Sequence, residues 1–423
     1  MPMRIAAALL LFVSLRAACQ TQVFAVLEEF DRIAAQPLWP GFEPRKIPVA
    51  LYDGASTYLY RHPSPPKEFL PLEGHPGIYV FAGRHPSMLA NTSTQIGGVT
   101  TATLGLAPEG RSQAAVLVHE CFHVFQQQRR PTWTANEATL FTYPIEDTEG
   151  LALSRLEMEA LRRALAGNPA CWTGGVLKVR RERFARLPAG AVAYERGTEL
   201  HEGLAQYVEG LAAGRKEVRF RSFGPSEVRQ RGYLSGEALA RLLDQVAPGW
   251  KSKVERSLDE LLPEPSGASC DFTDEERQAA RRQAQADVEA LKQGRAELRR
   301  MFEAQPGWRI VVQAAEGKPL LLRNFDPINV ERLSEREILH KRMLQLGNDA
   351  GSLEILNHGS MTTAAGAHPL FDGVRKWTAA GLEAQPEIQR DSDKISITAP
   401  SVKVSFTGAE TELQPQAVAV HLR

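Results

Sequence analysis

The chain has 423 residues, of which 43% are hydrophobic and 24% are charged, and its formal net charge at pH 7 is zero. This composition is typical of a globular protein and leaves room for two or three domains. The balanced charge, without a separate block rich in lysine and arginine, indicates that neither nucleic acid nor anionic lipid is a partner.

Residues 1–19 predict an export signal. Arg4 precedes an apolar run at residues 5–15, which is too short to span a bilayer. We therefore expect an exported protein without a membrane span, located in the periplasm, outside the cell or attached to the cell surface. Attachment would use a lipid on Cys19, because residues 17–19 are similar to a bacterial lipobox, although Arg16 stands where that pattern usually has leucine.

Residues 20–110 are predicted to be β-rich. After a short helix at residues 23–35, β-prone runs alternate with turns rich in proline and glycine, which is typical of an antiparallel sheet. These runs cover residues 48–52, 57–60, 77–81 and 97–104.

Residues 112–128 predict a buried helix that ends before Pro131. His119, Glu120 and His123 lie in it and form the pattern H-E-x-x-H, which such a chain would contain by chance roughly 0.03 times. Residues four apart share one helix face, so both imidazoles can reach one zinc ion while the carboxylate acts on water there. The competing interpretation is a structural helix with two packed histidines.

Residues 111–303 are predicted to be mostly helical and to carry this zinc site. Thr273 and Glu276 have the capping-box form, which begins a charged helix that we interpret as a solvated connector. Leucine and alanine recur at helical spacing in residues 151–165, 193–211 and 238–246.

Residues 304–423 are predicted to form a separate β-rich accessory domain, because β-prone runs return after residues 306–307. Three histidines in this part lack ligand spacing and are expected to be ordinary core or surface residues: His340, His358 and His368.

Cys171 and Cys270 are the pair left for a disulfide, because Cys121 lies in the zinc motif and Cys19 in the export signal. A bridge would fit an oxidising compartment. The sequence leaves open whether it forms.

A catalytic zinc needs a third protein ligand and one position open to water. The metzincin pattern would place glycine and histidine three and six residues after His123, but Gln126 and Arg129 stand there. A carboxylate from a later helix is the remaining common solution, and it makes the chain similar to gluzincin metallopeptidases.

Glu202 begins a segment, residues 202–205, that resembles the E-G-x-A segment of the alanyl-aminopeptidase family, where the glutamate is the third ligand. Residues 149–152 have the same form at a shorter distance from the H-E-x-x-H motif, so Glu149 is the alternative. We favour Glu202 because residues 207–209 extend the resemblance. His201 is expected to point away from the metal.

Tyr233 and Gly236 resemble the Y-x-x-G helix of the same family, which implies that the Tyr233 hydroxyl donates to the oxyanion of the transition state. Such a donor is typically worth roughly 3 kcal/mol. The resemblance covers residues 97–243. The family's G-x-M-E-N segment is absent, with residues 97–100 in its place, which argues against an assigned aminopeptidase activity.

The resulting expectation is an α+β protein with a zincin-like N-terminal antiparallel sheet, an active-site helix, a helical subdomain and a β-rich C-terminal domain. The resemblance implies an exported metallopeptidase that holds one Zn²⁺ through His119, His123 and Glu202. Glu120 would activate the zinc-bound water that attacks a peptide or protein substrate, and Tyr233 would stabilise the transition state. The strand at residues 97–106 is expected to pair with an extended substrate.

Two other classes of function stay open. One is an exported binding protein whose zinc is structural and closed by both Glu149 and Glu202. The other is a zinc hydrolase that acts on an ester or an epoxide, which the sequence does not separate from a peptidase.

Overall fold

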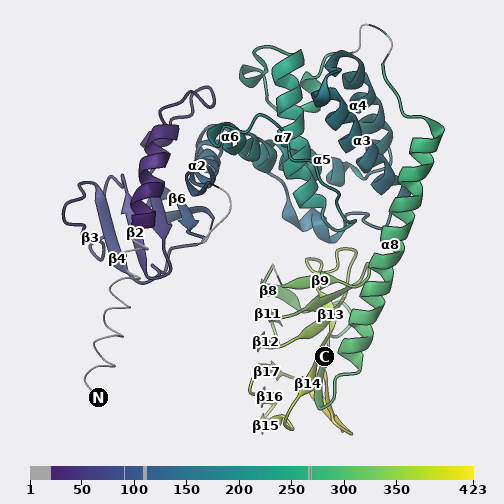
Figure 1. Cartoon of the computed structure of the whole chain (residues 1–423). Coiled ribbons are helices and arrows are strands. Elements are labelled where there is room, and N and C mark those ends of the chain that lie inside the picture. Colours follow the sequence, from purple (N-terminus) through teal and green to yellow (C-terminus); the bar gives the residue numbers. More distant parts are fainter. Residues whose placement is uncertain (1–20, 90, 108–111, 265–266, 268, 328) are drawn as a thin grey trace, which may run out of the picture. The chain divides into compact units, whose positions relative to one another are not determined.

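The computed structural model describes residues 21–89, 91–107, 112–264, 267, 269–327 and 329–423, so the predicted export signal with Cys19 lies outside the described residues. Three sheets and a set of helices make the protein a mixed α+β structure (Figure 1). The chain divides into two compact units. The first comprises Met1–Glu137 and Glu149–Arg281, and the second comprises Ala138–Thr148 and Arg282–Arg423.

The first unit contains a six-stranded sheet in the order β3-β4-β2-β1-β6-β5. Its strands are β1 (Val49–Tyr52), β2 (Ser56–Tyr60), β3 (Leu70–Pro71), β4 (Ile78–Ala82), β5 (Thr92–Ile96) and β6 (Val99–Gly105). Neighbouring strands are antiparallel except β1 and β6, which are parallel, so the prediction of a purely antiparallel sheet is wrong for this pair. After strands β2 to β5, the chain returns as β6. Strand β6 pairs with the edge of β1 that β2 does not occupy, and it runs parallel to β1.

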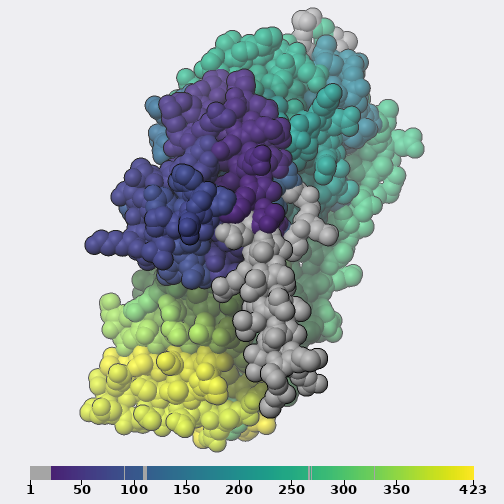
Figure 2. All heavy atoms as spheres, turned by 60° about the vertical axis from the view of Figure 1, so that its left-hand side comes forward, coloured from purple at the N-terminus to yellow at the C-terminus, as the bar shows by residue number. Residues whose placement is uncertain are grey.

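A helix at residues 21–33 packs against this sheet, as predicted for this part of the chain. The Asp31 carboxylate accepts hydrogen bonds from the Tyr60 hydroxyl at 2.7 Å and from the Arg61 guanidinium at 2.5 Å. The purple surface of the helix and the blue surface of the sheet adjoin in Figure 2. These contacts fix the helix to the end of β2.

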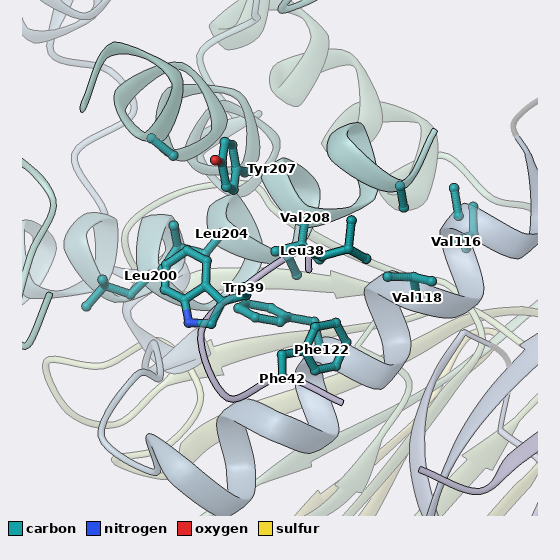
Figure 3. Close-up of a cluster of buried hydrophobic side chains, with 14 of the residues drawn as sticks. Leu38, Trp39, Phe42, Val116, Val118, Phe122, Leu200, Leu204, Tyr207 and Val208 are labelled. Carbon is teal, nitrogen blue, oxygen red and sulfur yellow. The ribbon is translucent and has the colours of Figure 1, made fainter. Parts of the chain in front are cut away.

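Helix α2 (Gln113–Arg129) follows β6 in the chain and confirms the predicted buried helix. Ser112 caps it, since its hydroxyl accepts a hydrogen bond from the amide of Ala115. The buried face of α2 packs on α6 (Leu204–Ala212) and on residues 38–42, with aromatic rings filling the space between them (Figure 3). This apolar packing holds α2 rigidly beneath the site described below.

The first unit also contains α3 (Thr148–Ala166), α4 (Pro169–Phe184), α5 (Ala189–Thr198) and α7 (Val228–Val246), with short 3₁₀ turns at Pro44–Lys46, Trp250–Ser252 and Asp259–Leu261. A further 3₁₀ turn, Glu137–Phe141, lies almost entirely in the second unit. A disulfide joins Cys171 and Cys270, which are 99 positions apart in the sequence. Residues 193–211 are helical throughout, as predicted, but a single π-helical turn, Glu199–Gly203, stands between α5 and α6.

Gly203 and Gly236 let the π turn and α7 approach each other closely. A Cβ added at Gly203 would lie 2.5 Å from the Cα of Gly236, and one added at Gly236 would lie 2.6 Å from the Cα of Gly203. Only residues without a side chain fit at this crossing. The two glycines of the E-G-x-A and Y-x-x-G segments are therefore contact partners, which brings the two segments together.

Helix α8 (Asp274–Glu303) begins in the first unit and continues into the second. Its predicted capping box is confirmed, because the Thr273 amide donates to Glu276 at 2.8 Å and the Glu276 amide donates to the Thr273 hydroxyl at 3.2 Å. Among the described residues, no helix combines the length and the apolar character needed to cross a membrane.

The second unit contains two sheets around one apolar core. One sheet has the order β18-β19-β7-β14-β13-β10-β9, and the other has the order β15-β16-β17-β12-β11-β8. Side chains along these strands alternate between buried and exposed positions, as strands with one face on a core require. The strands are β7 (Trp308–Gln313), β8 (Leu321–Phe325), β9 (Val330–Arg332), β10 (Glu337–His340), β11 (Met343–Asn348), β12 (Gly351–Leu356), β13 (Ser360–Ala364), β14 (Val374–Leu382), β15 (Glu387–Asp391), β16 (Lys394–Ala399), β17 (Val402–Thr407), β18 (Glu410–Gln414) and β19 (Ala417–His421).

Candidate metal centre

The two histidines of the H-E-x-x-H motif converge with Glu202 into a group that could hold a metal ion. His119, His123 and Glu202 each offer one ligand atom, and these atoms lie within 4.8 Å of one another. Glu202 Oε2 lies 3.8 Å from His119 Nε2 and 3.3 Å from His123 Nε2. Ligands of a tetrahedral ion with bonds of about 2.1 Å lie about 3.4 Å apart, so the spacing suits a bound ion.

Glu149 lies outside this group. Its carboxylate accepts two hydrogen bonds from the guanidinium of Arg281, at 2.7 and 2.9 Å. Of the two carboxylates that the sequence offered as the third ligand, the structure brings Glu202 to the histidines and gives Glu149 an arginine partner.

Polar contacts at Nδ1 accompany the orientation of both rings, whose Nε2 atoms face Glu202. Gln126 Nε2 donates to the carbonyls of Leu200 and His201, each at 2.9 Å, so its Oε1 is the atom that accepts from His123 Nδ1 at 2.8 Å. The Nε2 lone pair of His123 is then free for a metal. His119 Nδ1 lies 3.2 Å from the buried carboxylate of Glu209. Such outer partners orient metal-binding histidines.

Glu202 receives two further contacts from α7. Arg229 donates to its Oε1 at 2.8 Å, and the Tyr233 hydroxyl also hydrogen-bonds to this carboxylate. Burial opposes the charge of Glu202, but the contacts with His119 and His123 outweigh it and hold the pKa of Glu202 well below its usual range. Glu202 is therefore an ionised, buried carboxylate.

The centre gathers three buried carboxylates around its imidazoles, those of Glu120, Glu202 and Glu209. Burial lowers the proton affinity of His119, but the facing carboxylates of Glu202 and Glu209 raise the pKa of His119 to about 9. Burial raises the pKa of Glu120, whose side chain is 5% exposed and makes no hydrogen bond or ion pair within the described residues. A cation is the natural counterpart of such a set.

His201 does not point away from the centre, so that expectation is wrong. Its ring lies 4.3 Å from the ring of His123, and it lines the same cavity. The cause is the π turn, whose smaller rotation per residue keeps His201 and Glu202 on neighbouring sides of the helix. Burial and the nearby His123 lower the pKa of His201 to about 4, so this ring is neutral.

A cavity of about 440 Å³ opens at the centre. Glu120, His119, His123, Glu202 and Tyr233 line it on the helical side, and residues 91–93 line it on the side of the sheet. The predicted substrate-pairing strand, β6, is an inner strand between β1 and β5, so it has no free edge. The free edge beside the cavity belongs to β5.

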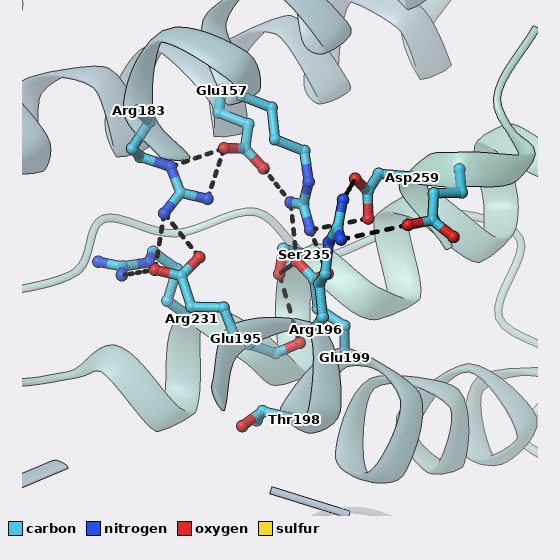
Figure 4. Close-up of polar contacts among 12 residues, drawn as sticks. Glu157, Arg183, Glu195, Arg196, Thr198, Glu199, Arg231, Ser235 and Asp259 are labelled. Carbon is cyan, nitrogen blue, oxygen red and sulfur yellow. Dashed lines mark hydrogen bonds and ion pairs between the residues drawn. The ribbon is translucent and has the colours of Figure 1, made fainter. Parts of the chain in front are cut away.

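A buried network of ion pairs holds the first residue of the π turn in place (Figure 4). Arg180 bonds to Glu199, the first residue of that turn, at 3.0 Å and to Glu157 at 2.5 Å. The hydroxyl of Ser235 on α7 donates to the same Glu199 at 2.7 Å. The network thus ties together α3, α4, α7 and the turn that presents Glu202.

Sequence reasoning missed three residues that shape the centre: Gln126, Glu209 and Arg229. Gln126 is three residues after His123, and Glu209 is seven residues after Glu202, both spacings that return to one helix face. These spacings could have indicated from the sequence that Gln126 and Glu209 lie near the centre. Arg229 had none, because its partner Glu202 is 27 residues away.

Comparisons of the chain with protein-family models, with curated proteins and with solved structures found no match. The functional argument therefore depends on the sequence motif and the geometry of the centre.

Proposed function

We propose that this protein is an exported zinc metallopeptidase of the gluzincin type, with a zincin-like first unit. The observation that carries the proposal is the convergence of His119, His123 and Glu202 at ligand distance beside the unpaired carboxylate of Glu120. Two imidazoles and one carboxylate form a common protein ligand set for catalytic zinc, with the fourth position left to water or substrate.

His119, His123 and Glu202 would hold the ion. When bound, zinc supplies Lewis-acid polarisation of a carbonyl group and of a water molecule. Two features of the chain fit it: the Nε2 atoms face Glu202, and the buried carboxylate of Glu120 beside them makes no ion pair within the described residues. Zinc is the proposed ion because an H-E-x-x-H helix with a glutamate as third ligand is a ligand pattern of zinc hydrolases.

Glu120 is the proposed general base. It is buried, it lines the cavity, and burial raises the pKa of its carboxyl group, so it can take a proton from water and return it to the leaving amine. A structural metal site would have no use for such an unpaired carboxylate.

Tyr233 is the proposed oxyanion donor. It lines the cavity next to Glu202, and burial followed by the charge of Glu202 raises the pKa of its hydroxyl, so the group stays protonated and able to donate. Arg229 holds the other oxygen of Glu202 and would keep that carboxylate in place during turnover.

The edge of β5 offers the main-chain groups that an extended peptide needs. Asn91, Thr92 and Ser93 line the cavity at this edge, so a substrate strand placed there would run past Glu120. This feature favours a peptide over a small ester or epoxide. The alternative with a structural zinc expected both Glu149 and Glu202 on the metal, but Glu149 is bound to Arg281.

Export stays a prediction from residues 1–19. The disulfide between Cys171 and Cys270 supports it, because such bridges persist mainly in oxidising compartments.

The test is cleavage of a mixed peptide library by the zinc-loaded protein, with Glu120→Gln alongside. We expect cleavage by the wild type and a loss of roughly 10²- to 10⁴-fold in kcat in the variant, because a positioned base contributes about that much. The variant should still bind zinc, since Glu120 is not a ligand. Turnover that survives in Glu120→Gln would contradict the proposal.

A further inference from the structure

A second cavity, of about 410 Å³, adjoins the one at the metal centre. The two cavities share Arg229 and Tyr233 as lining residues. The second cavity is lined by three arginines, Arg219, Arg221 and Arg229, and none of its described lining residues is acidic. The three arginines define what is called the arginine pocket below.

One arginine of the arginine pocket has no carboxylate partner among the described residues. Arg229 bonds to Glu202, which the proposed function already assigns to the metal, and lies 3.7 Å from Glu137. Arg221 pairs with Glu227 at 2.9 Å. Arg219 makes no ion pair with any residue that the structure describes, and it is exposed to the cavity and to solvent.

Local contacts hold the pocket in shape. The guanidinium of Arg221 lies 4.0 Å from the centre of the Phe223 ring. Glu227 bonds to Arg221 through one oxygen, and its second oxygen accepts from the amide of Gly224 at 2.7 Å at the start of α7. Arg219 is therefore the guanidinium group of the pocket that is left for a partner from outside the chain.

We propose that the arginine pocket binds a carboxylate of the substrate close to the bond that is cleaved. This inference rests on the proposed peptidase function. Guanidinium groups match carboxylates in shape and form short charge-assisted hydrogen bonds to them. Since Arg229 and Tyr233 line both cavities, the acidic group lies close to the scissile bond. The substrates are peptides with Asp or Glu near that bond, or peptides cut near a free C-terminus.

The first experiment measures cleavage. Peptides with Glu at each of three positions on either side of a fixed cleavage sequence are compared with their Gln counterparts, using wild type and the double variant Arg219→Gln/Arg221→Gln. We expect wild type to prefer Glu at one of these positions by about tenfold or more in kcat/KM, and the double variant to lose that preference. Equal cleavage of Glu and Gln peptides by wild type would overturn the inference while leaving the peptidase function intact.

The second experiment measures binding and does not require turnover. Fluorescein-labelled Glu and Gln peptides are titrated into zinc-loaded Glu120→Gln, with and without the two arginine substitutions. Tighter binding of the Glu peptide that disappears with Arg219→Gln/Arg221→Gln supports the pocket, and equal affinities contradict it. Arg32→Gln is the control, because this exposed arginine lies in the first unit and lines neither cavity.

Peptides with a free or an amidated C-terminus distinguish the two possible sources of the carboxylate. If the pocket takes a C-terminal carboxylate, amidation of the terminus removes the preference and an internal Glu does not restore it. If the pocket takes an acidic side chain, amidation has no effect. Folding of the double variant is checked by its thermal midpoint and by its zinc content, which both should match wild type.

Discussion

The buried ion network and the metal centre both gather charged side chains around the π turn, but they balance their charges differently. In the network, Arg180 and Arg183 are each bonded to two carboxylates, and Arg231 lies 3.2 Å from Glu195 (Figure 4). At the centre, by contrast, Glu120 has no ion-pair partner in the described part of the chain. The charges of the network are paired within the chain, whereas the metal centre contains a buried carboxylate without an ion-pair partner.

This difference distinguishes a cluster with a structural role from a cluster with a functional role. A buried charge costs free energy unless it is paired, so a cluster whose charges are all paired within the chain can act as a rigid scaffold. A cluster with an unpaired buried carboxylate needs something that the chain does not provide, such as a cation or a proton. Removal of a charged side chain from the network should therefore destabilise the fold. Removal of a charged side chain from the centre should weaken metal binding.

Removal of Arg180 should cause the largest loss of stability. The variant Arg180→Met leaves Glu157 and Glu199 buried without their main partner, which should lower the free energy of unfolding by about 3–5 kcal/mol. Urea unfolding measures it. The neighbouring Arg181 pairs with Glu264 at the exposed surface, so Arg181→Met should cost under about 1 kcal/mol. Equal effects of the two substitutions would remove the distinction between network and surface.

Replacement of Glu202 should act on metal binding instead. We expect Glu202→Gln to lower zinc affinity at least about 100-fold, because a ligand is lost, and to abolish the rise in thermal midpoint that zinc gives the wild type. The matched control is Glu149→Gln, which removes only the bond to Arg281 and should keep both. The reverse outcome would move the third ligand to Glu149.

Gly203→Ala tests the crossing that joins the two clusters. The added Cβ would meet the Cα of Gly236 at 2.5 Å, and backbone atoms cannot move aside cheaply, so we expect a loss of about 1–3 kcal/mol together with weaker zinc binding. A Cβ added at Gly190 in α5 meets nothing within 4 Å, so Gly190→Ala should be neutral or stabilising. Calorimetric unfolding of both variants provides the comparison, and a harmless Gly203→Ala would contradict the close approach.

Glu209→Gln should weaken metal binding less than Glu202→Gln does. Glu209 faces Nδ1 of His119, and loss of such an outer carboxylate typically lowers metal affinity about 10- to 100-fold. Competition with a zinc chelator measures this change. An unchanged affinity would mean that Glu209 serves its other partner, Arg215, rather than the metal centre.

The parts of the centre that follow helix spacing could be predicted from the sequence. His119 and His123 share one helix face because four residues make about one turn, and the resemblance at residues 202–205, extended by residues 207–209, favoured Glu202 over Glu149. The π turn could not be foreseen, and it reversed the expectation for His201. The network with Arg180 was equally invisible, because its pairs join α3, α4 and the π turn and depend on how those helices pack.

The sheets show the same division. The β-prone runs predicted where strands form, since β1, β2, β4 and β6 fall on them. They could not predict which strands pair, because pairing depends on contacts between distant residues. As a result β6 was expected at an open edge, whereas β5 covers it.

The most direct test of the central claim is a zinc titration of metal-free protein by calorimetry, with the double variant His119→Ala/His123→Ala alongside. The ligand geometry at the centre predicts one zinc bound per wild-type chain and none in the double variant, while both proteins keep their folded circular dichroism spectra. A wild type that binds no zinc, or a double variant that binds as much as wild type, would show that His119, His123 and Glu202 are not a metal centre.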